Sequence, residues 1–344
     1  MNNAKRVLIF RHGSLGDTIV ALPCFHLIAR AFPDAERRLL TTIFPSDKVV
    51  APSAVLENTG LVHGYFSYDA RRWHITQLVR LRNEFREWKP DVLIYLAEPR
   101  SFAGTWRDAL FFKSCGIKEL IGVPYTKALR ENRWLVERRR FEHESERLAR
   151  CLKDLGDARI HDEASWDLRL TNEENEAAAR CLEGWAGREQ FIVATIAAKV
   201  RAKDWGSENW SKLLERLNRF YPRLGLALVG AEAEAEYSGK VARGWKGPLL
   251  NLCGRLNLRE SVAVMKHAIF YLGHDSGPMH LASAMGVSCV ALFVRASKPG
   301  VWFPYGNDHQ VIHHQKNGRQ TAPITVDEVF KVTQKMIEKE SVKQ

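Results

Sequence analysis

At 344 residues, with 45% of them hydrophobic, the chain is long enough for two domains that each bury a core. It contains no run of about 18 apolar residues and no apolar signal-peptide centre before its first strand, so we expect a cytoplasmic protein without a membrane-spanning helix. A formal net charge of +11 indicates an acidic partner, either a phosphorylated substrate, an anionic membrane surface or nucleic acid.

Short apolar runs alternate with longer amphipathic stretches in the first half of the chain. The runs predict strands at residues 7–10, 39–44, 62–66, 92–96 and 120–123. Because strands separated by helices usually pair in parallel, this half predicts a parallel sheet with helices on both faces. An amphipathic helix over 143–156 closes the first domain, which we place at residues 1–170.

The second half repeats the pattern after a polar, acidic region, residues 171–188, which is expected to link the domains. Strands are expected at 191–196, 224–229, 249–252, 269–272 and 289–293, with helices at 210–220, 232–243, 259–268 and 278–285. They predict a second domain over 189–324, followed by a C-terminal helix segment, 325–344. The fold class is therefore α/β, with two doubly wound, Rossmann-like domains and a cleft between them.

The loop over residues 11–17 directly follows the first strand, and ligands of such sheets bind beyond the carboxyl ends of strands. Gly13 and Gly16 permit close backbone approach, but the loop is neither a G-x-G-x-x-G motif nor a P-loop. Asp17 has two interpretations. It either caps the next helix or faces the cleft as a general base.

Two loops of the second domain carry charged candidates. Lys203, after the strand at 191–196, either pairs with Asp204 at the surface or neutralises a phosphate. Glu234, after the strand at 224–229, is either a helix first-turn acid or an acceptor for ribose hydroxyls.

The stretch from Asp275 to His280 lies between an expected strand and an expected helix. Asp275 and Ser276 are N-cap residue types, and Pro278 suits a first helical turn. Free N–H groups and the positive end of the helix dipole there predict a phosphate or nucleotide site. The alternative is an ordinary helix start with His280 half-buried one turn inside.

Residues 275–282, followed by 290–293, resemble the signature of glycosyltransferase family 9, the bacterial lipopolysaccharide heptosyltransferases. Residues 13–17 with Leu22-Pro23 are similar to that family's N-terminal motif, and Lys203-Asp204-Trp205 resembles its K-x-W element. Further matches are His143-Glu144, Gly230 with Glu234, and residues 299–306.

The resemblance implies a GT-B fold and an inverting transfer, usually from ADP-L-glycero-D-manno-heptose. It implies Asp17 as the base and Lys203 with the Ser276 and Gly277 amides as stabilisers of the leaving diphosphate. It further implies that Glu234 holds the ribose, that Asp275 or His280 contacts sugar or phosphate, and that Ala198 and Leu256 are donor-binding positions. Ala197-Ala198 and Val294-Arg295 depart from the family pattern.

No cofactor or metal is expected, because the resemblance implies a metal-independent transfer and the sequence has neither a D-x-D pair nor a plausible metal cluster. The six cysteines are scattered without a C-x-x-C pair, which predicts neither a zinc site nor a disulfide framework.

A basic segment lies between the strand at 120–123 and the helix at 143–156, and it contains Arg130, Arg133, Trp134 and residues 138–140. It is either a solvated loop, a contact for acceptor phosphates or a peripheral contact with an anionic inner membrane. No nucleic-acid-binding module is recognised, so nucleic acid is not an expected partner. The expected partners are a nucleotide-sugar donor and a phosphorylated glycolipid or glycan acceptor. Two other functions stay open: a sugar-nucleotide epimerase of the same architecture and a non-catalytic, basic surface-binding protein.

Overall fold

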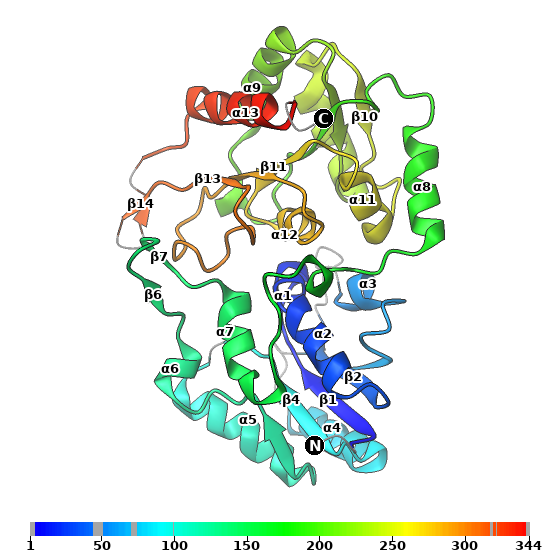
Figure 1. The fold of residues 1–344 in the computed structure, drawn as a ribbon, viewed down its shortest axis with the longest axis vertical. Coiled ribbons are helices and arrows are strands. Elements are labelled where there is room, and N and C mark those ends of the chain that lie inside the picture. The colour runs from blue at the N-terminus through cyan, green and yellow to red at the C-terminus, as the bar shows by residue number, and fades with distance from the viewer. Residues whose placement is uncertain are drawn as a thin grey trace. The chain divides into compact units, whose positions relative to one another are not determined.

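The structure, a computed structural model, describes residues 4–43, 51–69, 74–98, 100–316, 319–320 and 322–341. The chain divides into two compact units, Met1–Arg169 (unit 1) and Leu170–Gln344 (unit 2), and each contains a parallel sheet with helices on both faces (Figure 1). The α/β doubly wound class expected from the sequence is confirmed.

Unit 1 is built on a five-stranded parallel sheet with the order β3-β2-β1-β4-β5. Its strands are β1 (Arg6–Phe10), β2 (Glu36–Ile43), β3 (Gly64–Asp69), β4 (Val92–Tyr95) and β5 (Glu119–Ile121). The central strands β1 and β4 are apolar at nearly every position, because helices cover both of their faces.

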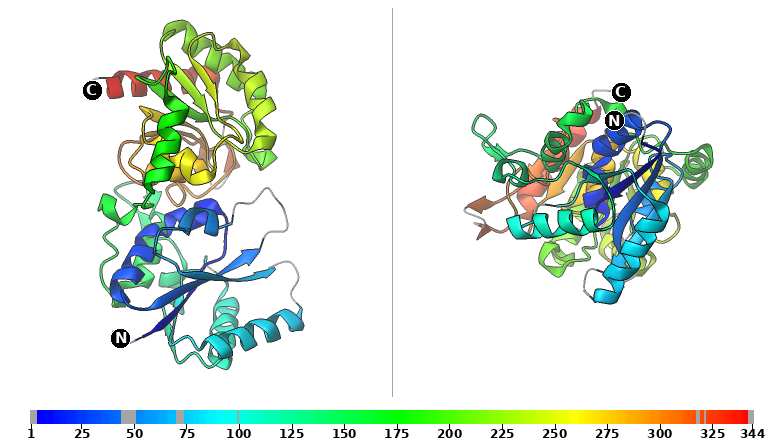
Figure 2. Two further views of the ribbon diagram at one scale, coloured as in Figure 1. Left: turned by 90° about the vertical axis from the view of Figure 1, so that its right-hand side faces the viewer. Right: turned by 90° about the horizontal axis from the view of Figure 1, so that it is seen from below.

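Two sets of helices cover the unit 1 sheet. Leu8 and Phe10 of β1 share a core with α4 and α5, so the alternate residues Val7 and Ile9 face the opposite side, where α2 lies (Figure 2). The helices are α1 (Leu15–Val20), α2 (Leu22–Ala31), α3 (Ser53–Leu56), α4 (Ile75–Trp88), α5 (Phe102–Ser114), α6 (Lys127–Arg130) and α7 (Glu144–Cys151). A two-stranded hairpin, β6 (Trp134–Leu135) and β7 (Arg140–Phe141), precedes α7.

Unit 2 is built on a six-stranded parallel sheet with the order β10-β9-β8-β11-β12-β13. Its strands are β8 (Phe191–Thr195), β9 (Gly225–Leu228), β10 (Leu249–Asn251), β11 (Phe270–His274), β12 (Cys289–Leu292) and β13 (Gln310–Ile312), with a separate hairpin of β14 (Gln315–Lys316) and β15 (Arg319–Gln320). One face of this sheet shares a core with α9 and α13.

The α-helices of unit 2 are α8 (Asn172–Leu182), α9 (Ser207–Phe220), α10 (Ala235–Val241), α11 (Leu258–Met265), α12 (Gly277–Ala284) and α13 (Val326–Ser341). The expected linker region, residues 171–188, contains α8. This helix packs against α11, and Arg259 Nε donates to Glu174 Oε1 at 2.5 Å across that contact. Among the described residues, no helix is both long enough and apolar enough to cross a membrane.

The strand order reverses once in each sheet. In unit 1 the chain moves outward from β1 through β2 to β3, then returns to place β4 on the other side of β1. In unit 2 the same reversal separates β8 from β11. Loops leaving neighbouring strands in opposite directions open a crevice at the carboxyl edge, so these two points are the favoured ligand sites of doubly wound sheets.

The ten strands expected from the sequence each have a counterpart in the two main sheets. Phe44, at the end of one of them, lies outside the described residues, as do residues 342–344 of the expected C-terminal segment. β13 was not predicted. It has only three residues, and only Ile312 among them is buried, so it carries too little apolar pattern to be recognised.

Candidate active site

Asp17 lies in the first turn of α1, beyond the carboxyl end of β1. Its Oδ2 accepts hydrogen bonds from the backbone N–H of Ser14 at 2.5 Å and from Ser14 Oγ at 2.7 Å. Ser14 is therefore the N-cap, and Asp17, at the third helical position, completes a capping box with it, so Asp17 does cap this helix, although not from the N-cap position. Gly13 has a φ of +130°, and a Cβ at this position would lie 2.6 Å from the Asp17 carboxyl. The glycine thus permits the turn that brings the carboxylate this close to the loop.

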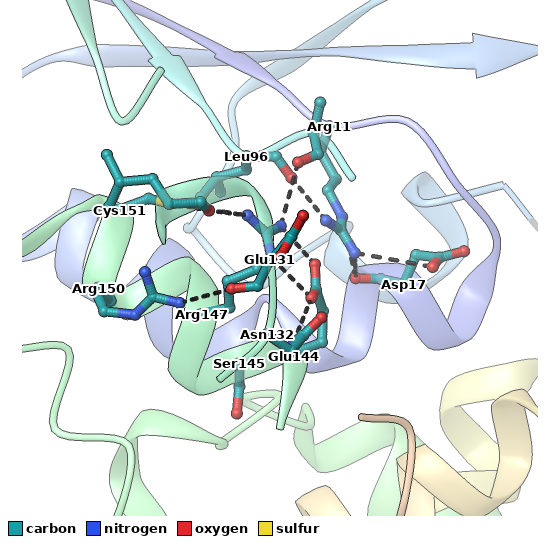
Figure 3. Close-up of polar contacts among 12 residues, drawn as sticks. Arg11, Asp17, Leu96, Glu131, Asn132, Glu144, Ser145, Arg147, Arg150 and Cys151 are labelled. Carbon is teal, nitrogen blue, oxygen red and sulfur yellow. Dashed lines mark hydrogen bonds and ion pairs between the residues drawn. The ribbon is translucent and has the colours of Figure 1, made fainter. Parts of the chain in front are cut away.

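Arg11 connects three segments around Asp17 (Figure 3). Its buried guanidinium donates from Nη1 to the carbonyl oxygen of Leu96 at 2.6 Å and from Nη2 to that of Asp17 at 2.6 Å. The same Nη2 lies 3.9 Å from Asp17 Oδ1. Leu96 follows β4, and Arg11 itself follows β1. The Arg11 side chain therefore fixes the start of α1 against the ends of both strands, β1 and β4, at the reversal point of the unit 1 sheet.

Glu98, also beyond β4, is a site residue that the sequence did not predict. Burial, followed by the interaction with the Asp17 carboxyl, raises the pKa of Glu98 to about 8. Burial also acts to raise the pKa of Asp17, but the interaction with Glu98, the charge of Arg11 and the donors of Ser14 together lower it. Asp17 is therefore the ionised member of the pair at neutral pH.

The sequence contained a signal for Glu98. It lies three positions after β4, at the carboxyl edge where ligands of such sheets bind. The loop after this strand was among those not considered, and it has no glycine pattern and no cluster of charge before Glu98.

A buried ion pair on α7 lies next to this group. Arg147 Nη2 is 2.6 Å from Glu144 Oε1, and both side chains are 1% exposed. Burial acts to raise the pKa of Glu144, but the hydrogen bond and charge of Arg147, with the charge of Arg11, hold that pKa below its usual value. His143, the N-cap of α7, accepts at Nδ1 from the Ser145 N–H at 3.2 Å. The His143-Glu144 pair thus begins α7 and places a buried carboxylate near Arg11.

Lys203 and Asp275 meet at the reversal point of unit 2. Lys203 Nζ lies 2.6 Å from Asp275 Oδ2 and donates to the Asp275 carbonyl oxygen at 3.0 Å. The expected alternative, a surface pair with Asp204, was wrong, because Asp204 Oδ1 accepts from the Gly206 N–H instead. The lysine side chain is 30% exposed, so its ammonium is held in place yet reachable.

α12 begins immediately after Asp275. Its N-cap is Ser276 and its first residue is Gly277, and Ser276 makes no side-chain capping hydrogen bond. Ser276 Oγ donates instead to the carbonyl oxygen of His274 at 3.2 Å. No side chain in the described part of the chain is recorded as accepting from the first-turn N–H groups, which suits an anion at this helix end. His280, one turn further, is buried, and its ring lies edge-on to Trp302 at 6.3 Å.

His274, the last residue of β11, links these two loops and was not predicted. Its Nε2 accepts from the Trp205 N–H at 3.1 Å and from Trp210 Nε1 at 3.3 Å. Burial lowers its pKa to about 4, so the ring is neutral at pH 7 and Nε2 is free to accept. Because Trp205 is two residues from Lys203, His274 fixes the lysine loop to the strand that carries Asp275.

Glu234 ends a short 3₁₀ turn (Glu232–Glu234) after β9, and its Oε2 accepts from the Ala231 N–H at 2.9 Å. Half-buried Ala198 and Leu256 lie in the loops after β8 and β10, at the same edge. No hydrogen bond or ion pair between described residues joins Glu234 to Lys203 or Asp275. Asp17 belongs to unit 1, whereas all the other predicted site residues belong to unit 2. Within the described part of the chain, no three His, Cys, Asp or Glu side chains form a group that could hold a metal ion.

Comparison with known proteins shows one family. The model described as glycosyltransferase family 9 (heptosyltransferase) matches residues 80–326. Lipopolysaccharide heptosyltransferase 3 of Escherichia coli K12 is 23% identical over 46% of this chain and 49% of its own length. Lipopolysaccharide core heptosyltransferase OpsX of Haemophilus influenzae is 22% identical over 60% of each chain. The chain thus spans about half to three fifths of these curated relatives.

Solved structures extend the likeness to nearly the whole chain. A family 9 glycosyltransferase from Veillonella parvula has a TM-score of 0.72 at 18% identity and covers 97% of this chain and 98% of its own. The E. coli heptosyltransferase WaaC, solved with ADP, has a TM-score of 0.64 at 20% identity, with 97% and 99% covered. The same enzyme with ADP-2-deoxy-2-fluoro heptose has a TM-score of 0.62 at 18% identity, with 96% and 99% covered. These structures share the GT-B fold with the chain.

Proposed function

Because the chain belongs to glycosyltransferase family 9, we propose that it transfers a heptose or a related sugar from an ADP-activated donor to a glycan hydroxyl. The acceptor is a lipopolysaccharide core or a related glycan, as the names of the relatives suggest. The transfer inverts the anomeric centre and uses no metal ion. The observation that carries this proposal is the ionised Asp17 carboxylate, fixed by Ser14 and Arg11 at the reversal point of the unit 1 sheet.

Asp17 acts as the general base in this mechanism. The acceptor oxygen attacks the anomeric carbon from the face opposite the diphosphate, and the bond from that carbon to the diphosphate oxygen breaks. The acceptor proton moves to Asp17 as the new bond forms. A carboxylate with a lowered pKa suffices, because the attacking hydroxyl becomes strongly acidic once its oxygen begins to share electrons with the anomeric carbon.

Lys203 and the first turn of α12 stabilise the leaving diphosphate. The lysine supplies a positive charge, and the N–H groups at Ser276 and Gly277 supply uncapped donors at the positive end of the helix. Because these donors are already in place, they stabilise the negative charge that develops on the diphosphate and need not move during the reaction. They take the role that a divalent metal ion has in other transferases.

The adenosine part of the donor would lie over the loops after β8, β9 and β10. A carboxylate after the second strand of a doubly wound sheet accepts hydrogen bonds from ribose hydroxyls, and Glu234 has this position after β9. WaaC was solved with ADP and with an ADP-heptose analogue, which supports ADP as the nucleotide. Ala198 and Leu256 would line this region as small or apolar contacts.

The acceptor is carried by a lipid in the lipopolysaccharide relatives, and unit 1 has a surface suited to an anionic membrane. Phe102, Trp106 and Leu110 follow one another at four-residue spacing on α5, so they share one face, and all three are exposed. The Arg130 guanidinium lies 5.3 Å from the Phe102 ring centre. The next segment, hairpin β6–β7, adds exposed Trp134 and further arginines. Apolar side chains beside cations fit the boundary between lipid headgroups and acyl chains.

A binding and product experiment tests the function. The purified chain is heated with ADP-, UDP-, GDP- and CMP-sugars, and a specific rise in melting temperature identifies the donor. The stabilising donor is then incubated with and without heptose-deficient lipopolysaccharide, and the products are separated by mass. We expect ADP and a glycan heavier by one heptose only when acceptor is present. Release of a free altered sugar without acceptor would instead show an epimerase, and no turnover of any donor would overturn the enzyme assignment.

A further inference from the structure

The loop that carries Lys203 is joined to the end of β11 at two consecutive residues. In the described part of the chain, Lys203 Nζ lies 2.6 Å from Asp275 Oδ2 and donates to the Asp275 carbonyl oxygen at 3.0 Å. The Trp205 N–H donates to His274 Nε2 at 3.1 Å. The contact with Asp275 holds the lysine ammonium, and the contact with His274 holds the backbone two residues further along the same loop.

These two contacts respond differently to a bound diphosphate. Asp275 and a phosphate oxygen compete for the same ammonium, so the contact between Lys203 and Asp275 is weakened when a diphosphate binds. His274 is 1% exposed and its bond with Trp205 is buried, so a ligand does not reach that bond. The hydrogen bond between His274 and Trp205 therefore stays in place while the lysine turns to the phosphate.

Trp205 is a firm anchor because it is held at its backbone and at its ring. Its indole Nε1 donates to the Ile324 carbonyl oxygen at 2.8 Å. A single residue, Asp204, separates Trp205 from Lys203. The Asp204 carboxylate accepts from the Gly206 N–H at 2.9 Å, which fixes the turn that follows the lysine. Holding the Trp205 backbone therefore also limits where the Lys203 backbone can lie.

The hydrogen bonds that His274 accepts define its tautomer. Nε2 accepts from the Trp205 N–H and, at 3.3 Å, from Trp210 Nε1, so this nitrogen carries no proton. A neutral imidazole has one N–H, which must then be on Nδ1. Nδ1 is buried and has no hydrogen-bond partner among the described residues. The anchor thus acts through Nε2 alone.

Protonation of the His274 ring would break both of these hydrogen bonds. A charged imidazole has an N–H on each nitrogen, so Nε2 would then point a proton at two donors. Burial lowers the pKa of His274 to about 4 and outweighs the charges of Asp204 and Asp275, which act to raise it. The charge of Lys203 also lowers this pKa. The ring is therefore neutral at pH 7, as the two hydrogen bonds require.

We propose that His274 is a positioning residue for the leaving diphosphate, because it keeps the Lys203 backbone in place while the ammonium exchanges Asp275 for a phosphate oxygen. This inference rests on the proposed function, in which Lys203 stabilises the diphosphate. His274 itself touches neither donor nor acceptor. Its effect passes through Trp205 to the lysine, so it should disappear when the lysine is removed.

A double-mutant cycle tests this route. His274→Phe keeps a ring against Trp210 but removes the acceptor, so it should lower kcat at least tenfold with less than threefold change in the KM for the donor. In a chain that already carries Lys203→Met, the same substitution should lower kcat by less than twofold, because no ammonium is left to position. A tenfold loss in both backgrounds would overturn the proposal, since His274 would then act independently of the lysine.

Two further variants separate positioning from packing. His274→Gln offers a carbonyl oxygen that can accept from the Trp205 N–H, although less rigidly than the ring, so its kcat should lie within about fivefold of native. His267→Phe, at an exposed histidine of the same unit, is the matched control and should keep the native kcat. A loss in His274→Gln as large as that in His274→Phe would show that ring packing matters rather than the acceptor, and would overturn the proposal.

Calorimetric titration with ADP repeats the cycle without sugar transfer. ADP carries the charge that the leaving diphosphate acquires, so His274→Phe should weaken ADP binding at least fivefold when Lys203 is present and less than twofold in Lys203→Met. That result would support the positioning role even if the chain transfers no sugar, in which case only the proposed function fails. Equal weakening in both backgrounds would overturn this inference even if transfer is observed, and no binding of ADP to the native chain would contradict both.

The tautomer can be measured on the native chain, which avoids any dependence on how His274→Phe folds. In protein with ¹⁵N-labelled histidine rings, the signal absent from His274→Gln should show a proton on Nδ1 and none on Nε2 at pH 7. A proton on Nε2 would exclude the hydrogen bond from Trp205 and overturn the proposal, whatever the chain catalyses.

Discussion

Lys203 Nζ lies 2.6 Å from Asp275 Oδ2, and this ion pair joins the loop after β8 to the loop after β11. The two strands are neighbours where the order of the unit 2 sheet reverses, so the pair lies at the favoured ligand position of the fold. Asp275 orients the ammonium, and His274 fixes the backbone of the lysine loop through Trp205. A bound diphosphate would compete with Asp275 for the Lys203 ammonium. The lysine would then exchange the carboxylate for a phosphate oxygen.

Lys203→Met is expected to lower kcat/KM for transfer at least a hundredfold, a loss of about 2.7 kcal/mol in transition-state stabilisation. Methionine keeps the length of the side chain but removes the charge that stabilises the diphosphate. Steady-state kinetics with saturating acceptor measure the effect. Lys199→Met, an exposed lysine of the same loop, is the matched control and should stay within about threefold of native. Equal losses in both variants would show that net charge, rather than the Lys203–Asp275 geometry, matters.

Asp17→Asn is expected to lower kcat by about a thousandfold while donor affinity changes by less than about twofold. Asparagine can still accept a hydrogen bond from Ser14 but cannot take the proton of the acceptor hydroxyl. Donor binding should therefore be retained while the transfer step is slowed. Calorimetric titration with the donor and single-turnover transfer measure the two effects. Asp34→Asn, an exposed aspartate in the same unit, should leave both unchanged. Turnover near the native rate in Asp17→Asn would remove its assignment as the base.

The sequence located single site residues better than it located their partners. Asp17 and Asp275 follow strongly apolar strand runs, and the strand-end rule selects such positions directly. Glu98 obeys the same rule, yet its importance depends on Asp17, which lies far away along the chain and reaches it only through the pairing of β1 with β4. His274 lies two residues beyond the strand expected at 269–272, and only folding brings Trp205 and Trp210 to its Nε2.

Elements were predictable where burial on both faces imposed an apolar run. Val7 to Phe10 and Val92 to Tyr95 are buried throughout, and both strands were recognised. α8 was expected to be part of a linker because its sequence is acidic and polar. Its packing depends on the Glu174–Arg259 ion pair and a few small residues, which leave little hydrophobic pattern in the sequence.

Glu144→Gln is expected to lower the free energy of unfolding by about 3 kcal/mol, because it leaves the buried Arg147 guanidinium without its counter-charge. Urea unfolding followed by circular dichroism measures the loss. The double variant Glu144→Gln/Arg147→Met removes the uncompensated charge as well. It should recover more than half of that loss. A double variant as unstable as Glu144→Gln alone would mean that packing around Arg147, rather than its charge, causes the effect.

Stability should fall on acidification because of His274. Burial lowers the pKa of His274 from 6.5 to about 4, so between these values the unfolded chain binds a proton that the folded chain does not. The native state is therefore favoured above pH 6.5 and loses this contribution as pH falls toward 4. His274→Gln loses an imidazole acceptor, so its melting temperature should be lower at pH 7, and the difference from native should narrow by pH 4.5. A difference independent of pH would show that folding does not lower the pKa of His274.

The exposed face of α5 should govern binding to anionic vesicles. Phe102→Ser/Trp106→Ser/Leu110→Ser removes the apolar side chains that would enter the headgroup region, and cosedimentation with phosphatidylglycerol-containing vesicles should weaken at least tenfold. Ile75→Ser/Val79→Ser removes two exposed apolar side chains from α4 and is the matched control, expected to bind as native. Binding should also decline with added salt and be absent on neutral phosphatidylcholine, because Arg130 and the arginines of hairpin β6–β7 act through charge. Native-like vesicle binding by the α5 variant, with transfer to a water-soluble acceptor intact, would place membrane contact elsewhere on the chain and leave the catalytic assignment untouched.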